Sequence, residues 1–216
     1  LQMLYRQGMI IPNHPNNCGK RPLLLGKKNQ VYAQLNYIYR GNYGLSSEQE
    51  LVDAGLSKEE AFDYFRMKLK FAFGKIKSTN EFLDFKIIDE AAVEIKNGVI
   101  LKRLGLNNYE VLYKDEVVSI DLNLGQNENY DPPYQLGHHP IKKDHFSIIH
   151  SGDGDGWDIH NPCMSSIIIY NGNYYLIDAG PNIAQTLESL SISVSNIKGI
   201  FQTHAHDDHF SGLTTL

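Results

Sequence analysis

The sequence predicts an α+β protein built from two successive parts, residues 1–140 and 141–216. Three observations predict this organisation. Helix-forming patterns are concentrated between residues 47 and 73, apolar runs typical of strands occur before and after them, and a stretch rich in Asn, Pro and Gly, residues 126–140, separates two groups of strands. The 216 residues suffice for one large domain or two small ones, and 42% hydrophobic with 21% charged residues is typical of a folded protein.

The first part begins with segments that favour short strands and loops over helix. They are the run RPLLLG and the alternating stretch QVYAQLNYIYRGNYG, both within residues 1–45. Two helices are predicted next. Ser47 with Glu50 opens a short one that Gly55 ends, and Ser57 with Glu60 forms a capping box that opens a longer one. The longer helix carries an apolar stripe that predicts a buried core face: Phe62, Phe65, Leu69, Ala72 and Phe73.

Strand patterns fill the rest of the chain. Residues 86–124 read as an antiparallel meander, with turns at Asn97-Gly98, residues 107–108 and residues 114–115. After the predicted linker, 126–140, we expect the strand HFSIIHSG, the Gly/Asp loop DGDGWDIHNP and a hairpin turning at Asn171-Gly172. A helix over about 182–190 and the strand KGIFQT complete this part.

Composition narrows the class of protein. No run of roughly 18 apolar residues is present, and the first ten residues lack the apolar stretch of a signal peptide, so we expect a cytoplasmic protein with no membrane partner. Because the first residue is Leu, we expect a processed piece or a fragment. The distant Cys18 and Cys163 indicate neither a disulfide framework nor a zinc ribbon, and each is predicted to be a buried, small apolar residue.

Charge is unevenly distributed along the chain. Residues 1–77 carry 12 Lys and Arg against six Asp and Glu, whereas residues 78–216 carry eight against 19. A basic first part could attract a ligand that bears phosphate, but the pattern favours solvated helix and loop faces.

The stretch GIFQTHAHDDHFSGL, near the end of the chain, concentrates metal-binding side chains. His204 and His206 are two residues apart, so in an extended segment both imidazoles face the same side. Asp208 and His209 follow where a turn begins. Imidazole and carboxylate without thiolate suit Zn²⁺ and also permit Mn²⁺ or Fe²⁺. The pattern predicts two divalent metal ions, which would lower the pKa of a shared water toward neutrality.

The segment THAHDDHFSGL resembles the T-H-x-H-x-D-H-x-x-G-L signature of the metallo-β-lactamase superfamily. YLIDAGPN and IKGIFQT precede it in the order that this superfamily uses, and the resemblance covers about residues 145–216. Within the superfamily it is most similar to the branch of tRNase Z and related phosphodiesterases. The resemblance implies that residues 141–216 form the first half of an αββα sandwich, incomplete at its C-terminus. Residues 1–140 do not share this resemblance and are expected to form an α+β accessory domain of unknown role.

The resemblance also implies roles for individual residues. His204 and His206 would bind the first metal, and Asp208 and His209 the second, with Asp208 also catalytic. Asp178 matches an acidic position at a strand end, where it would orient a ligand by hydrogen bonding; a simple strand-end cap is the alternative.

Four further residues near this region receive weaker assignments. Asp207 occupies a variable position and is expected to face solvent or bond locally. His150 and His160 flank the Gly/Asp loop and could contact substrate, although surface or packing roles are favoured. Trp157 could cover the site or belong to the core. No substrate-binding residue is assigned.

The superfamily requires ligands that this chain does not contain. A third His for the first metal, an acidic bridging ligand and a last His for the second normally follow well downstream. We therefore expect an incomplete portion of a longer protein or one piece of a cleaved protein, with the missing C-terminal half on the same or a separate polypeptide. A degenerate non-enzyme is the third possibility, and a homo-oligomer stays open.

Three functions compete on this basis. The first is hydrolysis of a phosphodiester or related ester, with a small-molecule or nucleotide-type phosphoester as substrate. The second is hydrolysis of a thioester or lactone at the same metals. The third is a regulatory or scaffold module whose metal site is vestigial.

Overall fold

A computed structural model describes residues 1–128, 131–142 and 144–216 of the chain. It contains both helices and sheets, so the protein is of the α+β class. The chain divides into two compact units, Leu1–Asn129 and Tyr130–Leu216, referred to below as the first and second units. Two residues of the predicted linker, Asn129 and Tyr130, lie outside the described residues.

The division between the units falls within the predicted linker and about ten residues before the predicted boundary at 140. The later part of that linker contacts the second unit. The backbone N–H of His139 donates to the carbonyl of Ser189 at 2.7 Å, and Ile141 packs against the core of this unit.

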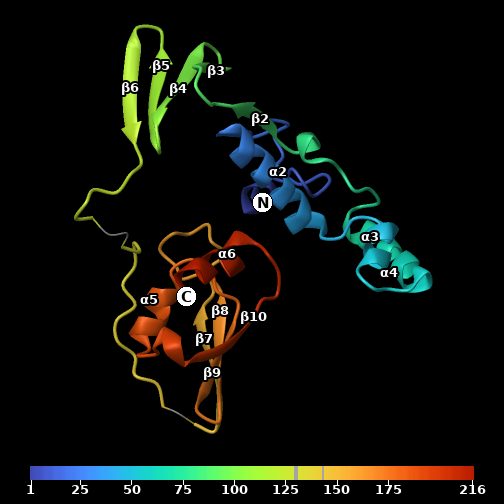
Figure 1. The fold of residues 1–216 in the computed structure, drawn as a ribbon, viewed down its shortest axis with the longest axis vertical. Coiled ribbons are helices and arrows are strands. Elements are labelled where there is room, and N and C mark those ends of the chain that lie inside the picture. Colours follow the sequence, from blue (N-terminus) through green and yellow to red (C-terminus); the bar gives the residue numbers. More distant parts are fainter. Residues whose placement is uncertain (129–130, 143) are drawn as a thin grey trace. The chain divides into compact units, whose positions relative to one another are not determined.

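The first unit begins with helices. They are α1 (Gln2–Arg6), α2 (Lys28–Tyr43), α3 (Glu48–Asp53) and α4 (Lys58–Phe71), with the 3-10 turn η1 (Thr79–Glu81) after them (Figure 1). The prediction of strands and loops across residues 1–45 is therefore wrong for α1 and α2. Alternation of apolar and polar residues misled it, because the side chains that α2 buries, Val31, Leu35 and Ile38, are spaced four and three residues apart, as on one helix face.

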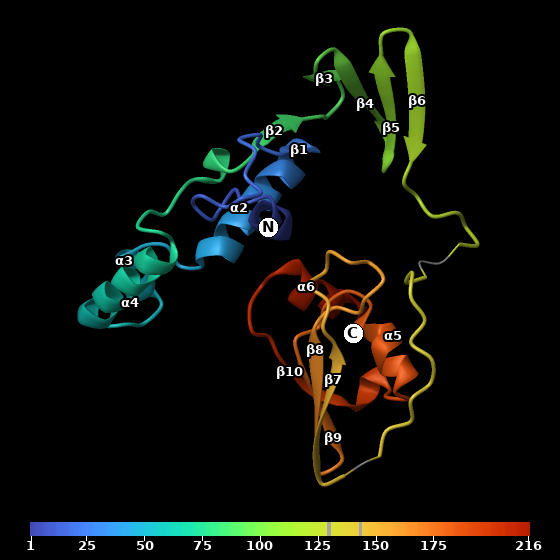
Figure 2. The same cartoon turned by 180° about the vertical axis from the view of Figure 1, so that it is seen from behind.

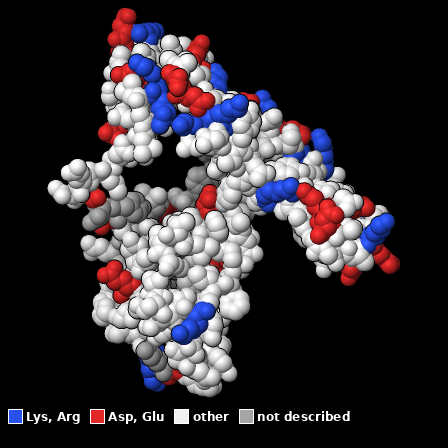
Figure 3. Space-filling model, in the orientation of Figure 1, with Lys and Arg blue, Asp and Glu red and all other residues white. Residues whose placement is uncertain are grey.

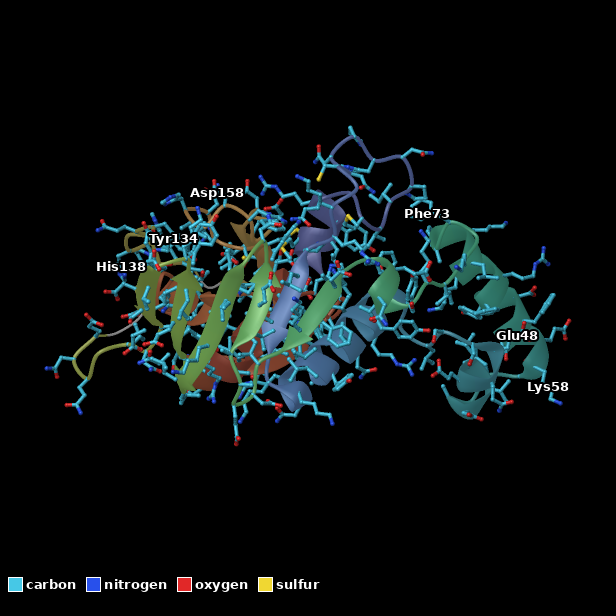
Figure 4. All side chains as sticks on the ribbon, turned by 90° about the horizontal axis from the view of Figure 1, so that it is seen from above. Glu48, Lys58, Phe73, Tyr134, His138 and Asp158 are labelled. Atoms are coloured by element: carbon cyan, nitrogen blue, oxygen red, sulfur yellow. The ribbon has the colours of Figure 1, made fainter. Side chains whose placement is uncertain are left out.

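The helix starts predicted for α3 and α4 are confirmed. The hydroxyl of Ser47 accepts a hydrogen bond from the N–H of Glu50 at 3.1 Å. Ser57 and Glu60 exchange the two bonds of a capping box, at 3.2 and 2.9 Å. Figure 4 places Glu48 and Lys58, the first residues of the two helices, at the same end of this helical pair. Capping depends on residues within one turn, so the sequence suffices to predict it.

The predicted core stripe of α4 is only partly covered in the described residues: Phe65, Leu69 and Ala72 are half-buried, and Ala72 packs against the core of the first unit. Phe62 and Phe73 are 48% and 54% exposed, and Phe73 lies at the far end of α4 from Lys58 (Figure 4). Only Ala61 of this helix is buried. Helix α3 has six residues against the 14 of α4, so it is too short to cover the stripe.

The strands of the first unit form two sheets. Strand β1 (Leu23–Gly26) pairs in parallel with β2 (Asp84–Ile87), and the strand predicted for RPLLLG is thus confirmed. The strands β3 (Val93–Lys96), β4 (Val99–Gly105), β5 (Asn108–Tyr113) and β6 (Glu116–Asp121) form the predicted antiparallel meander in that order. Its turns carry positive φ at Asn97, Asn107 and Lys114, where the chain reverses.

The core of the first unit lies between α1, α2 and the segment before β2. Its buried members are Leu1, Leu4, Ile10, Val31, Leu35, Ile38, Tyr43, Phe82 and Leu83. On the face drawn in Figure 3, Lys and Arg of this unit alternate with Asp and Glu. Such a mixed surface is that of a solvated face.

The second unit is a four-stranded sheet with helices on one side. Its strands are β7 (Phe146–Gly152), β8 (Ser165–Tyr170), β9 (Asn173–Ile177) and β10 (Ile197–Phe201), in the order β10-β9-β8-β7. Helix α5 (Ile183–Ser189) and the turn η2 (Val194–Asn196) connect β9 to β10, which are parallel. Short helical segments, α6 (Asp207–Phe210) and η3 (Ser211–Thr215), follow β10. The predicted hairpin, helix and strands are confirmed, as Figure 2 shows from behind.

The two faces of this sheet differ in burial. Ile167 and Ile169 of β8 and Leu176 of β9 are fully buried against α5, with Leu187 among their neighbours. The opposite face exposes large apolar side chains: Phe146, Ile148, Tyr170 and Phe201. Exposure of one sheet face is what half of a sandwich would show.

The structure also bears on the burial of the two cysteines and on membrane-spanning helices. Cys18 is exposed and Cys163 is half-buried, so the prediction of two buried thiols is wrong for Cys18 and holds only in part for Cys163. Cys18 lies in a loop rich in Asn and Gly, which provides no apolar layer to cover it. No helix among the described residues has the length and apolar character to cross a membrane.

Candidate metal centre

Strand β10 delivers the histidine motif to one end of the second sheet. After Phe201 the chain has no regular secondary structure up to His206, which has an extended backbone, with φ −85° and ψ 150°, and is the N-cap of α6. Asp208 and His209 lie in the first turn of that helix. The turn that the sequence predicts at Asp208 and His209 is therefore present.

The four predicted ligand residues lie together. The ring centroids of His204 are 4.3 Å from those of His206 and 4.1 Å from those of His209. The Nε2 atom of His209 is 3.3 Å from Oδ2 of Asp208. Asp208 and His209 are 6% and 7% exposed. Among the described residues no three His, Cys, Asp or Glu side chains are arranged to hold a metal ion by themselves, so the ligand set stays a prediction.

Asp178 lies beneath the motif, immediately after β9, and is 4% exposed. Its φ of 63° is in the left-handed region, which few residues other than Gly adopt but which Asp tolerates. This conformation turns the chain out of the strand. The carboxylate contacts the segment that follows β10, which ties the ends of two parallel strands together.

The Asp178 carboxylate accepts hydrogen bonds from three residues. The Oδ1 atom accepts from the N–H of Thr203 at 2.7 Å, from its hydroxyl at 2.9 Å and from Nε2 of Gln202 at 3.0 Å. The Oδ2 atom lies 2.7 Å from the Thr203 hydroxyl and 2.8 Å from Nδ1 of His209. Gln202 and Thr203 were not singled out from the sequence. Thr203 is the first residue of the signature and could have been identified as a candidate. No feature of the sequence distinguishes Gln202.

The hydrogen bonds fix the protonation of this pair. Burial by itself raises the pKa of Asp178, but hydrogen bonds from Thr203 and His209 outweigh it, so the pKa lies below its ordinary value. An ionised carboxylate only accepts, so Nδ1 of His209 carries the proton that it donates to Asp178. In the neutral ring, the Nε2 lone pair is then directed away from Asp178 and is available to bind a metal.

A carboxylate oxygen of Asp208 lies close to the Nε2 atom of His209, so two acceptor atoms face each other. Its Oδ2 lies 3.3 Å from His209 Nε2, and its Oδ1 is buried without a hydrogen-bond partner among the described residues. Two acceptors that face each other repel unless a cation lies near both, and a buried, partnerless carboxylate oxygen is costly. A second proton on His209 would satisfy Oδ2 alone. A metal ion bound by Asp208 and His209 would satisfy both residues, so this donor set fits a divalent cation.

His206 is suited to binding in its neutral form. Partial burial, reinforced by the nearby His204, lowers the pKa of His206 below its usual value. Near neutral pH its ring is then unprotonated, which is the form that binds metal.

Three glycines allow the backbone around Asp208 to pack closely. A Cβ at Gly180 would lie 2.0 Å from the carbonyl oxygen of Asp208, and one at Gly212 would lie 2.0 Å from the carbonyl oxygen of Gly180. At Gly156, in the Gly/Asp loop, it would lie 3.0 Å from Cβ of Asp208. A side chain at Gly180 or Gly156 would press on Asp208, and one at Gly212 would press on the Gly180 backbone, which gives a steric reason for each glycine.

Two backbone hydrogen bonds hold the same segments together. Ala179 N–H donates to the His209 carbonyl at 2.7 Å, and Gly212 N–H donates to the Ala179 carbonyl at 2.9 Å. The position of His209 is therefore set by main-chain bonds as well as by its ring.

The other candidate residues contact groups outside the motif. His150 Nδ1 is 3.0 Å from the Ser166 hydroxyl, and His160 Nδ1 is 3.3 Å from the Pro133 carbonyl. Asp207 is exposed and Trp157 is half-buried. Burial raises the pKa of the Cys163 thiol, and nearby Asp208 and Asp155 add to this, which favours the neutral thiol.

Comparisons with known proteins give matches to part of the chain. The family model described as "Anti-Pycsar protein Apyc1" matches residues 146–216. Ribonuclease Z of Borreliella afzelii (strain PKo) is 41% identical over 69 residues, and so is Ribonuclease Z of Borrelia garinii subsp. bavariensis. Ribonuclease Z of Borrelia hermsii (strain HS1 / DAH) is 38% identical over the same length. No solved structure gives a significant match.

These likenesses are local. Each covers 32% of this chain and 22% of the relative, so the chain spans about a fifth of the length of the curated relatives that it matches. Over about a third of its length, the chain is thus similar to proteins named Ribonuclease Z.

Proposed function

We propose that this chain belongs to a metal-dependent hydrolase of the metallo-β-lactamase type that acts on phosphodiesters. The observation that carries the proposal is the pair Asp208 and His209. Their acceptor atoms lie 3.3 Å apart, and the second carboxylate oxygen of Asp208 is buried without a hydrogen-bond partner among the described residues. This arrangement has the chemistry of half of a metal site.

Two divalent ions, with Zn²⁺ preferred and Mn²⁺ or Fe²⁺ as alternatives, would share the four ligands. His204 and His206 would hold one ion and Asp208 and His209 the other, while Asp178 orients the His209 ring. When bound, the ions supply Lewis acidity and lower the pKa of a coordinated water. Four ligands leave two ions under-coordinated, so the proposal requires further ligands from a C-terminal segment, carried by the same or another polypeptide.

The phosphodiester substrate is supported by the local similarity to proteins named Ribonuclease Z. A two-metal site also suits in-line displacement at phosphorus, because it stabilises both the attacking and the leaving oxygen. The description of the matching family, "Anti-Pycsar protein Apyc1", names no substrate. It therefore does not distinguish phosphodiester hydrolysis from thioester or lactone hydrolysis. Thioester or lactone hydrolysis at the same metals is the second candidate.

The test uses the complete protein that contains this chain, purified with its metal. Metal content would be measured by elemental analysis, and turnover would be compared on bis-p-nitrophenyl phosphate, a thioester and a lactone. We expect bound Zn²⁺ and preferential turnover of the phosphodiester. His206→Ala should reduce activity at least about 100-fold, because even residues that only support a ligand cost 10–100-fold.

The matched control is His138→Ala. His138 is an exposed histidine in the second unit, in the segment beside α5 (Figure 4), and it should leave turnover unchanged. Preferential thioester or lactone turnover would select the second candidate. Absence of metal and of turnover on all three substrates would contradict both enzymes and favour a scaffold, and full activity in His206→Ala would contradict the site.

A further inference from the structure

Gln202 occupies a central position in the hydrogen-bond network although no role has been assigned to it. It follows β10 and precedes Thr203. Its side-chain Nε2 lies 3.0 Å from Oδ1 of Asp178, 2.7 Å from the carbonyl oxygen of His204 and 3.1 Å from the carbonyl oxygen of His209. All three neighbours are acceptors.

This environment fixes the orientation of the amide. The nitrogen of a Gln side chain has two hydrogens, so one of the three contacts is shared. With the amide reversed, its carbonyl oxygen would face three oxygen atoms, which would repel it. Only the orientation with nitrogen toward the acceptors is compatible with these contacts.

The three acceptors belong to three different segments. Asp178 follows β9, His204 lies in the segment between β10 and α6, and His209 lies on α6. One side chain thus connects both ends of the histidine segment to the carboxylate that orients the His209 ring. The residue itself is exposed, so it adds little to the apolar core and its contacts are directed at the site.

We propose that Gln202 is a positioning residue that holds the His204–His209 segment in its metal-binding conformation before metal arrives. The inference rests on the proposed metal site. Metal ligands bind more tightly when their orientation is fixed in advance, because less conformational freedom is lost on binding. Gln202 acts through Asp178 and two main-chain carbonyls, and it does not coordinate the metal.

Two variants test this role in the complete protein. Gln202→Met keeps the length and shape of the side chain but removes both N–H groups. Gln202→Glu keeps the size but directs an oxygen toward three acceptors, so it should be the more harmful. Gln135→Met is the control, since Gln135 is an exposed Gln of the same unit, in the segment beside α5.

The main measurement is metal affinity, independent of catalysis. Zn²⁺ dissociation constants would be obtained by competition with a chromophoric chelator, and the visible spectrum of the Co²⁺-substituted protein would report ligand geometry. We expect Gln202→Met to bind Zn²⁺ about 10–100-fold more weakly, with an altered Co²⁺ spectrum. The Tm of the metal-free protein should change by only a few degrees, because the side chain is exposed.

The outcomes separate this inference from the proposed function. If the wild-type protein binds Zn²⁺ and Gln202→Met binds it equally well with the same Co²⁺ spectrum, the positioning role is refuted while the metal site stands. A large loss of Tm in the metal-free variant with an unchanged Co²⁺ spectrum would show a structural role and also refute it. If the wild-type protein binds no metal, the proposed function and the positioning role both fall.

Discussion

Replacing Gly180 with Ala tests whether the close packing around Asp208 is required. A Cβ at this position would lie 2.0 Å from the Asp208 carbonyl oxygen and 2.9 Å from Cβ of Cys163. Cβ atoms in real structures essentially never approach heavy atoms closer than 3.0 Å, so the two backbones must separate by about 1 Å. The φ of Gly180 is not positive, which means that the penalty comes from contact rather than from backbone conformation.

The expected cost follows from this geometry. Overpacking a well-packed interior costs about 1–3 kcal/mol, and the upper end applies because a main-chain oxygen cannot rotate away as a flexible side chain does. For a unit of this size, 1 kcal/mol corresponds to about 4–8 °C in Tm. We therefore expect Gly180→Ala to lower the Tm of the second unit by about 10–20 °C and to weaken metal binding, because Asp208 moves with its backbone.

Thermal unfolding followed by circular dichroism measures the effect, with Gly199→Ala as control. A Cβ at Gly199, on β10, would meet its nearest atom, Cδ1 of Tyr175, at an ordinary 3.5 Å. That variant should change stability by less than about 1 kcal/mol, in the stabilising direction, since Ala restricts the unfolded chain. A Tm for Gly180→Ala within 3 °C of the wild type would refute the packing around Asp208.

Two other predictions address charged groups. Asp178→Asn places an NH₂ group against the donors that now bond to the carboxylate. We expect a loss of about 3–5 kcal/mol in the free energy of unfolding, measured by urea titration. A loss below about 1 kcal/mol would contradict the hydrogen-bond network. In the first unit, hydrogen bonding to Arg40 lowers the pKa of Glu50 from 4.5 to about 2. A lowered pKa stabilises the fold above the unfolded value, so the Tm advantage of wild type over Glu50→Gln should shrink as the pH falls from 4.5 toward 2; an advantage independent of pH would contradict it.

Local chemistry explains why much of the second unit could be predicted. The hairpin at Asn171-Gly172 and the strand leading to His204 depend on turn residues and on apolar runs that act over a few positions. The same holds for the caps at Ser47 and Ser57. In α2, by contrast, apolar and polar residues partly alternate along the sequence, and only the burial of Val31, Leu35 and Ile38 reveals a helical face. The sequence pattern of this segment favours a strand, whereas its spacing of buried residues favours a helix, and tertiary packing selects the helix.

For this protein the sequence alone determined the α+β class and the meander. It also determined the succession of strands that leads to the histidine motif and the four residues proposed to bind metal. Only the tertiary structure decided that Asp178 bonds to His209, that Gln202 joins the three segments and that Gly180 makes room for Asp208. The physical reason is distance along the chain. A motif of metal-binding residues at short spacing can be recognised in the sequence itself. Contacts between residues more than 20 positions apart form only when β9 and β10 pair in the folded protein.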